Sequence, residues 1–129
     1  MSLDLAKIRA DVRDVIASAG LGLNAYGWPE PQPEYPCAQL GFADPIEFHR
    51  VDCRDGASME FTLSLMVANA DLEAATTNLE ELVCSTLIEL LEDFESSAWS
   101  QLIVREARAF RRLESIDGLA CDLGVTVHA

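Results

Sequence analysis

The stretch Met59-Glu-Phe-Thr-Leu-Ser-Leu-Met-Val67 alternates large apolar residues with residues that are mostly polar. Met59, Phe61, Leu63, Leu65 and Val67 occupy every second position, and on an extended strand every second side chain points to the same side. The stretch is therefore predicted to be a strand with one buried face.

Further strands are predicted on both sides of this stretch. Before it we expect a short strand over 23–26, a strand over 37–43 that ends at Asp44-Pro45, and another over 46–53. Asp55-Gly56 lies between two alternating runs and predicts a hairpin turn. Near the end of the chain, residues 101–113 and 119–128 are predicted as two strands joined by a turn at 116–118.

Two segments carry apolar residues at helical spacing. The first covers 3–18, with Ser2 as a candidate N-cap and Gly20-Leu-Gly22 as its end, and its apolar face comprises Leu5, Ile8, Val12, Val15 and Ile16. The second begins after Asp71, which is placed to cap it, and continues to about 94. Its apolar stripe comprises Leu72, Leu79, Val83, Leu87, Leu90 and Phe94. Cys84-Ser85-Thr86 is its weakest stretch for helix, and is where a break into two pieces is expected.

The order of these elements predicts an α+β fold. We expect a single domain over 1–129, in which a mixed, mostly antiparallel β-sheet is flanked by an N-terminal helix and a long acidic helical region. A chain of 129 residues and 14.1 kDa has the size of one domain and can bury a real core.

Charge and cysteine content exclude several classes of protein. With 22 acidic and 9 basic side chains the net charge is −13, which opposes general binding to nucleic acid or anionic membranes. The four cysteines are far apart without a CxxC spacing, which indicates reduced thiols in a cytosolic setting. The N-terminal residues lack the apolar region of a signal peptide, and no apolar run is long enough to span a bilayer, so we expect a soluble protein.

No catalytic, cofactor-binding or metal-binding constellation is predicted. Nucleotide-binding loops, nucleophile elbows and zinc-protease motifs are absent from the sequence. His49 and Cys53 are four residues apart, which on a strand separates them by about 13 Å, and one histidine with one cysteine does not complete a zinc site.

A proline-rich arm over 27–36 is the most unusual segment. Four of the five prolines lie in Tyr26-Gly-Trp-Pro-Glu-Pro-Gln-Pro-Glu-Tyr-Pro-Cys37, so the segment should be extended and unable to pair inside a sheet. It carries two large aromatic residues, Trp28 and Tyr35. Either their rings fold back onto the core, or the arm reaches a neighbouring subunit.

The order and spacing of these segments resemble the tail terminator (tail-completion, or minor tail) proteins of long-tailed bacteriophages, over nearly the whole chain. The similar segments are Leu5-Ala-Lys-Ile-Arg-Ala-Asp-Val-Arg, Asn24-Ala-Tyr-Gly-Trp-Pro, Asp44-Pro-Ile-Glu-Phe-His, Phe61-Thr-Leu-Ser-Leu-Met-Val, Asn69-Ala-Asp71 and Leu123-Gly-Val-Thr-Val. The resemblance implies a mixed sheet flanked by helices and a role in assembly without catalysis. It differs in one respect, because the middle helical region is more acidic and more continuous than is usual in the family.

For function, the resemblance implies a hexameric ring on the head-proximal end of the tail tube. Such a ring ends tube polymerisation and provides the surface that joins the head, with the tube protein and head-completion or connector proteins as partners. The protein would be part of the virion, assembled in the cytoplasm of the bacterial host. DNA would pass through the lumen without specific binding, since an acidic wall repels phosphate. The alternatives are another neck component, such as a head-completion or connector protein, and a small cytosolic ligand-binding domain.

Ring formation requires two different patches that meet between subunits. The segment 71–95 contains eight acidic and no basic residues, Glu80 and Glu81 among them, whereas Arg105, Arg108, Arg111 and Arg112 are four of the nine basic residues. We hypothesise that one pair of these arginines meets the acidic segment of an adjacent subunit or of the tube. On one continuous strand, Arg105 and Arg111 would share one face, and Arg108 and Arg112 the other. The competing interpretations are pairing within the chain and, for the acidic segment, a solvated outer face.

Overall fold

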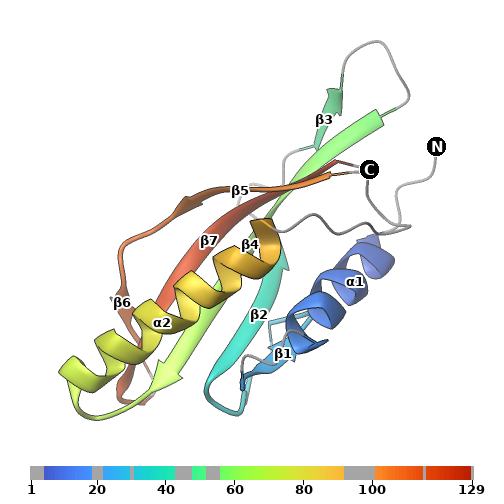
Figure 1. Cartoon of the computed structure of the whole chain (residues 1–129). Helices are drawn as coiled ribbons and strands as arrows, with labels where there is room; N and C mark the ends of the chain where they lie inside the picture. Colours follow the sequence, from blue (N-terminus) through green and yellow to red (C-terminus); the bar gives the residue numbers. More distant parts are fainter. Residues whose placement is uncertain are drawn as a thin grey trace.

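A computed structural model describes residues 5–18, 22–29, 31–42, 48–51, 56–91, 101–114 and 116–128. In these residues two helices lie on the same face of one twisted sheet (Figure 1). The predicted α+β fold with its flanking helices is confirmed.

The described part of the sheet has seven strands, with β1-β2-β4-β7-β5 as the main order. Two further strands pair beside this path, β3 with β4 and β6 with β7. The strands are β1 (Asn24–Tyr26), β2 (Cys37–Phe42), β3 (Phe48–Val51), β4 (Gly56–Ala68), β5 (Gln101–Ala107), β6 (Arg111–Arg112) and β7 (Gly118–His128). Among the described strands only β1 and β2 pair in parallel, so the sheet is mixed and mostly antiparallel, as predicted.

The alternating stretch forms most of β4, at the centre of the sheet. β4 pairs with β7 from Ser58↔His128 to Ala68↔Gly118, in a register that places apolar residues opposite one another. Leu63 faces Leu123 and Leu65 faces Cys121, and all four are buried. The predicted buried face of this strand is therefore observed.

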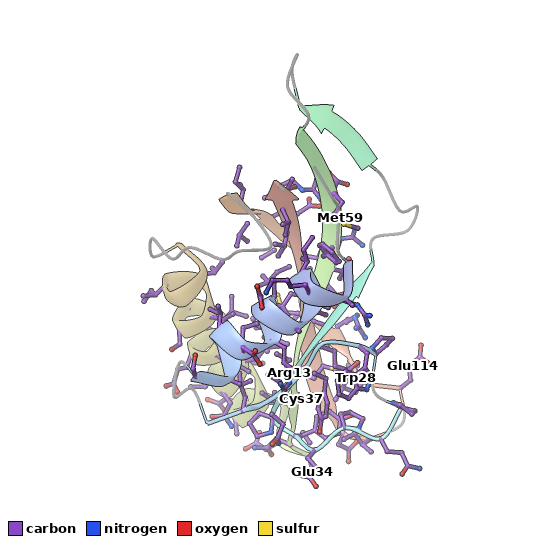
Figure 2. The ribbon with its side chains drawn as sticks, turned by 90° about the vertical axis from the view of Figure 1, so that its right-hand side faces the viewer. Arg13, Trp28, Glu34, Cys37, Met59 and Glu114 are labelled. Carbon is purple, nitrogen blue, oxygen red and sulfur yellow. The ribbon has the colours of Figure 1, made fainter. Side chains whose placement is uncertain are left out.

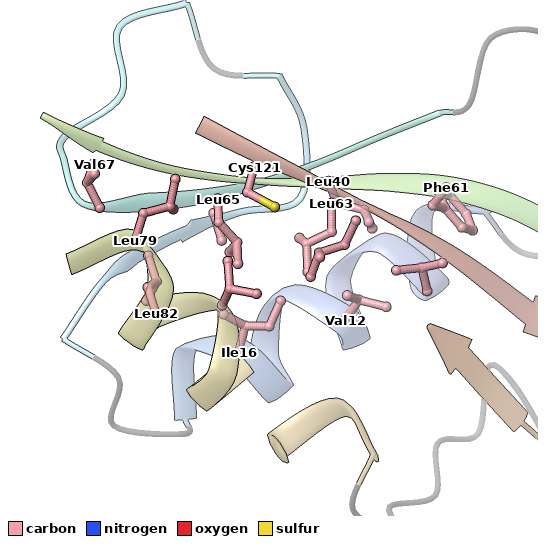
Figure 3. Packing of buried hydrophobic residues seen from close by; sticks show 14 of the residues in the cluster. Val12, Ile16, Leu40, Phe61, Leu63, Leu65, Val67, Leu79, Leu82 and Cys121 are labelled. Carbon is pink, nitrogen blue, oxygen red and sulfur yellow. The ribbon is translucent and has the colours of Figure 1, made fainter. Parts of the chain in front are cut away.

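Helix α1 (Leu5–Ser18) covers the β1–β2 side of the sheet. Ile8, Val12 and Ile16 are almost completely buried, at the spacing of one helical face. Figure 3 shows Val12 and Ile16 pointing into the same core as Leu63 and Leu65. Gly22, in the predicted stop, has φ +71°, a left-handed conformation that favours glycine.

Helix α2 (Leu72–Leu91) covers β4, β7 and β5. The Asp71 carboxylate accepts a hydrogen bond of 3.0 Å from the Glu73 N–H, which confirms the predicted N-cap. The predicted break at Cys84-Ser85-Thr86 is wrong, because the helix continues through these residues. Thr86 is fully buried, and tertiary packing of this kind overrides a weak local propensity.

The apolar stripe predicted for α2 also needs correction at its start. Leu72 is 41% exposed, whereas Ala75, Leu79, Leu82 and Val83 form the buried face. Position 72 is the first residue of the helix, and its side chain is not covered by the sheet. Phe94 and the side chain of Leu90 lie outside the described residues.

The C-terminal region departs from two continuous strands. β5 ends at Ala107 and β6 occupies only two residues, while a bulge shifts the pairing with β7 between Val104 and Glu106. A bulge inserts an extra residue, here Arg105, and so breaks the alternation on which the predicted arginine faces depend. At the other hairpin, Gly56 is already part of β4 and pairs with Val51, so the turn is longer than Asp55-Gly56, and 52–55 lie outside the described residues.

Candidate assembly surfaces

The sheet has a second face, which the described helices leave uncovered. Its side chains alternate with the core residues and include Glu60, Thr62 and Ser64 of β4 and Asp122 and Thr126 of β7. We call this surface the uncovered face. It is polar in the middle of the sheet, where the opposite face is entirely apolar.

Asp122 is the most strongly bonded residue of the uncovered face. Its two carboxylate oxygens accept hydrogen bonds of 3.2 Å from Nε and an Nη of Arg111, and Ser64 Oγ donates a third of 2.7 Å. Burial would raise the pKa of Asp122, but these hydrogen bonds and the charges of Arg111 and Arg108 outweigh it and lower that pKa. Asp122 is therefore held as a carboxylate.

A second ion pair lies further along the same face. Arg105 is 3.2 Å from the Glu60 carboxylate, across the strand β7 that separates β5 from β4. Gly124 of β7 leaves space for this, since a Cβ there would come 3.2 Å from an Arg105 nitrogen and 3.1 Å from Glu106 Cγ. Arg105 and Arg111 thus share the uncovered face, and both pair within the chain.

The β5–β6 connector, residues 108–110, and the strand β6 that follows it carry the other two arginines and an aromatic ring. The connector backbone is tied to β7, because the Arg108 N–H donates to the Asp122 carbonyl at 2.9 Å and Cys121 Sγ donates to the Arg108 carbonyl at 3.3 Å. Arg108 and Phe110 of the connector are exposed, and so is Arg112, the second residue of β6. Among the described residues neither Arg108 nor Arg112 forms an ion pair. In the ladder between β6 and β7, Arg112 lies opposite Leu119, whose side chain faces the core. Arg108 lies between β5 and β6, outside both strands.

The proline-rich arm folds back, and its two aromatic residues differ in exposure. Tyr35 packs beside a small buried cluster that contains Cys37, Met66 and Ala120, on the side of the sheet away from the helices. Trp28 is 46% exposed, and its ring makes an edge contact with Tyr26 at 5.9 Å between centroids. Figure 2 shows Trp28 on the outside of the molecule. The folded-back interpretation therefore applies to Tyr35, and an exposed aromatic surface remains at Trp28.

Hydrogen bonds hold the arm in this position. Asn24 Nδ2 donates to the Glu34 carbonyl at 3.0 Å, and the Glu34 N–H donates to the Tyr26 hydroxyl at 3.1 Å. The peptide bond between Tyr35 and Pro36 is cis. Burial, and secondarily the neighbouring Cys37, raise the pKa of Tyr35.

A cleft of about 450 Å³ opens between the arm and α2. It is lined by Tyr35, Pro36, Val67, Ala68, Asn78, Glu81, Leu82 and Ser85. We call it the arm cleft. It brings together Tyr35 and Glu81, which the sequence pattern placed in separate segments. Glu80 is exposed on the same helix but turned about 100° from Glu81, so it does not line the cleft. The sequence contained no signal for it, because it forms where two segments distant in the chain meet.

The described residues include three free cysteine thiols and no cluster of metal ligands. In this part of the chain no group of three histidine, cysteine or acidic side chains could hold a metal ion. Cys37 and Cys121 are buried free thiols and Cys84 is an exposed one, and burial raises the pKa of Cys37 to about 11. Cys53 and the side chain of His49 lie outside the described residues. No helix in the described part is long and apolar enough to cross a bilayer.

Comparison with known proteins identifies the fold. No protein-family model matches the chain, and no curated protein matches it either. A solved structure described as "Virion of native gene transfer agent (GTA) particle" contains a chain that superposes with a TM-score of 0.60. The two chains share a fold. The match covers 95% of this chain and 88% of the other at 20% sequence identity.

Proposed function

We propose that this chain is a structural protein of a virion, and that it acts as a tail terminator. In this role, copies of the chain form a hexameric ring on the head-proximal end of a tail tube, end its polymerisation and present the surface that joins the head. The main support is the fold shared with a chain of a virion over 95% of this sequence. The order of segments from the opening helix to the final strand, which resembles that of tail terminators, points the same way.

The distribution of charge is compatible with a closed ring. A ring requires a head-to-tail interface between two unlike patches. Exposed acidic residues lie on α2, while the exposed arginines 108 and 112 lie at the β5–β6 edge of the sheet. In contrast, Arg105 and Arg111 already pair with acidic residues on the uncovered face. They are therefore less suited to the hypothesised contact with the acidic segment of an adjacent subunit or of the tube.

The proposed partners are the tail tube protein on one side of the ring and head-completion or connector proteins on the other. The experiment is light scattering of the purified protein over a range of concentrations, followed by electron microscopy alone and with tail tubes. A hexameric ring that caps tubes at one end and stops their growth supports the proposal. A ring that binds filled heads but not tubes would instead indicate another neck component, and a stable monomer with a bound small molecule would indicate a ligand-binding domain.

A further inference from the structure

The arm cleft combines an apolar lining with an acidic margin. Val67, Leu82 and Pro36 contribute apolar surface, while the exposed Glu81 supplies the acidic margin. In a chain with net charge −13, few segments of a second copy could approach this margin without repulsion. The cleft therefore fits an occupant that carries an aromatic or aliphatic side chain together with positive charge.

The β5–β6 connector has this composition. Phe110 is 37% exposed, and Arg108 and Arg112 lie two residues to either side of it. Aromatic residues and arginine are the types that contribute most to protein interfaces. The hydrogen bonds from Arg108 and Cys121 hold the connector backbone in place before any contact, which reduces the entropic cost of docking.

The cleft and the connector are separate patches on one copy. The cleft lies on the side of the β4–β7 ladder toward β2 and the arm, and the connector joins strands that pair with the opposite edge of β7. Figure 1 shows β6 and β2 on opposite sides of this ladder. Two unlike patches at different places on each copy are what a head-to-tail contact requires.

We propose that the arm cleft receives the β5–β6 connector of a second copy of this chain. Phe110 lies against the apolar lining, and Arg108 and Arg112 on either side of it provide the positive charge that faces Glu81. This inference rests on the proposed function, since it specifies the interface by which the ring closes.

The test uses two charge reversals in the full-length protein. One variant carries Arg108→Glu with Arg112→Glu, and the other carries Glu81→Arg. Each is expected to weaken self-association at least about tenfold by light scattering. An equal mixture of the two is expected to recover assembly, because every contact between unlike copies is again between opposite charges. A variant that fails only because it is misfolded would not be rescued in this way.

A matched control carries Lys7→Glu with Arg13→Glu, the same change of charge on exposed positions of α1. It should assemble like the wild type, whereas Phe110→Ser should weaken assembly without a change in charge. If the wild type forms rings and both charge-reversal variants form them equally well, the inference is wrong and the proposed function still stands. A wild type that stays monomeric at every concentration would overturn both.

Discussion

Asp122 shows how a single acidic side chain can be held in the middle of a sheet. It is 18% exposed, and it accepts hydrogen bonds from a guanidinium and a hydroxyl group that come from different strands. Charge-assisted bonds to two oxygens of one carboxylate fix both distance and orientation. The same residue uses its backbone carbonyl to anchor the β5–β6 connector. Asp122 therefore holds Arg111 and Ser64 together on the uncovered face through its side chain, and holds the connector in place through its backbone.

Asp122→Asn should lower the free energy of unfolding at pH 7 by about 1–3 kcal/mol, because the bonds to Arg111 and Ser64 lose a charged partner. The folded protein lowers the pKa of Asp122 below the unfolded value of about 3.9. Its contribution is therefore fully present above pH 4 and is lost as the pH falls through the folded pKa. Urea unfolding at pH 7 and near pH 3 measures this, and the difference between variant and wild type should shrink at the lower pH.

Asp14→Asn is the control, because the bridge from Asp14 to Arg13 is exposed. Its effect should remain within about 0.5 kcal/mol at pH 7. A stability difference for Asp122→Asn that does not change with pH would contradict the assigned role of its charge.

Gly118 and Gly41 should respond in opposite ways to alanine. A Cβ at Gly118 would collide with the Val67 carbonyl oxygen and come 2.8 Å from Leu113 Cδ1, whereas a Cβ at Gly41 meets nothing within 4 Å. Gly118→Ala should lower the free energy of unfolding by about 1–3 kcal/mol or more through overpacking. Gly41→Ala should be neutral or stabilising by up to about 1 kcal/mol. If urea unfolding showed the same change in the free energy of unfolding for both substitutions, the space around each glycine would not explain its effect.

At the scale of elements, the length of α2 depends on the burial of one face of the helix more than on local helix propensity. Its local sequence includes two weak helix formers, Ser85 and Thr86, yet the helix passes through both. Thr86 is buried, and among the described residues its Oγ1 has no hydrogen-bond partner. The apolar neighbours on the same face supply the stability that local propensity lacks.

Leu79→Ala and Leu72→Ala compare a buried and an exposed leucine on this helix. Leu79 is fully buried, and its truncation should cost about 2–5 kcal/mol because it leaves a cavity. Leu72 is 41% exposed, and its truncation should cost less than about 1 kcal/mol. Thermal or urea unfolding of both variants measures this. If the two costs were similar, the assignment of the buried face would be wrong.

At the scale of the whole molecule, one sheet separates two surfaces of different character. Helices cover one face and enclose the core, and the other face carries paired charges. Among the described residues, the exposed acidic residues of α2 and the exposed arginines at the β5–β6 edge are two charged surfaces that a partner could contact. A ring built from such subunits retains a large negative charge.

The assembled protein should not bind DNA. The net charge of −13 per chain repels phosphate at long range, and this repulsion is strongest at low salt. Gel retardation of duplex DNA at about 50 mM salt, with a basic DNA-binding protein as the positive control, measures this. Tight binding by the ring would refute the expectation that DNA passes through its lumen without being held.

The strands, the helices and their approximate limits could be predicted from the sequence, since each depends on neighbours along the chain. The alternation in 59–67 and the helical spacing of Ile8, Val12 and Ile16 are local patterns, and burial confirms both. The cap at Asp71 is equally local. The break expected at 84–86 was wrong because propensity is local, whereas the burial of Thr86 depends on the sheet beneath it.

The surfaces depended on contacts between distant residues, so no local pattern could predict them. Alternation did predict that Arg105 and Arg111 share a face, but it gave no sign of their partners Glu60 and Asp122, which the register of β4, β7 and β5 brings near. The arm cleft exists because Tyr35 and Pro36, at the end of the arm, meet residues of β4 and α2 that are distant in the sequence. Periodicity is set by the geometry of the chain itself, whereas pairing and enclosure are set by packing between segments, which becomes visible only in the folded molecule.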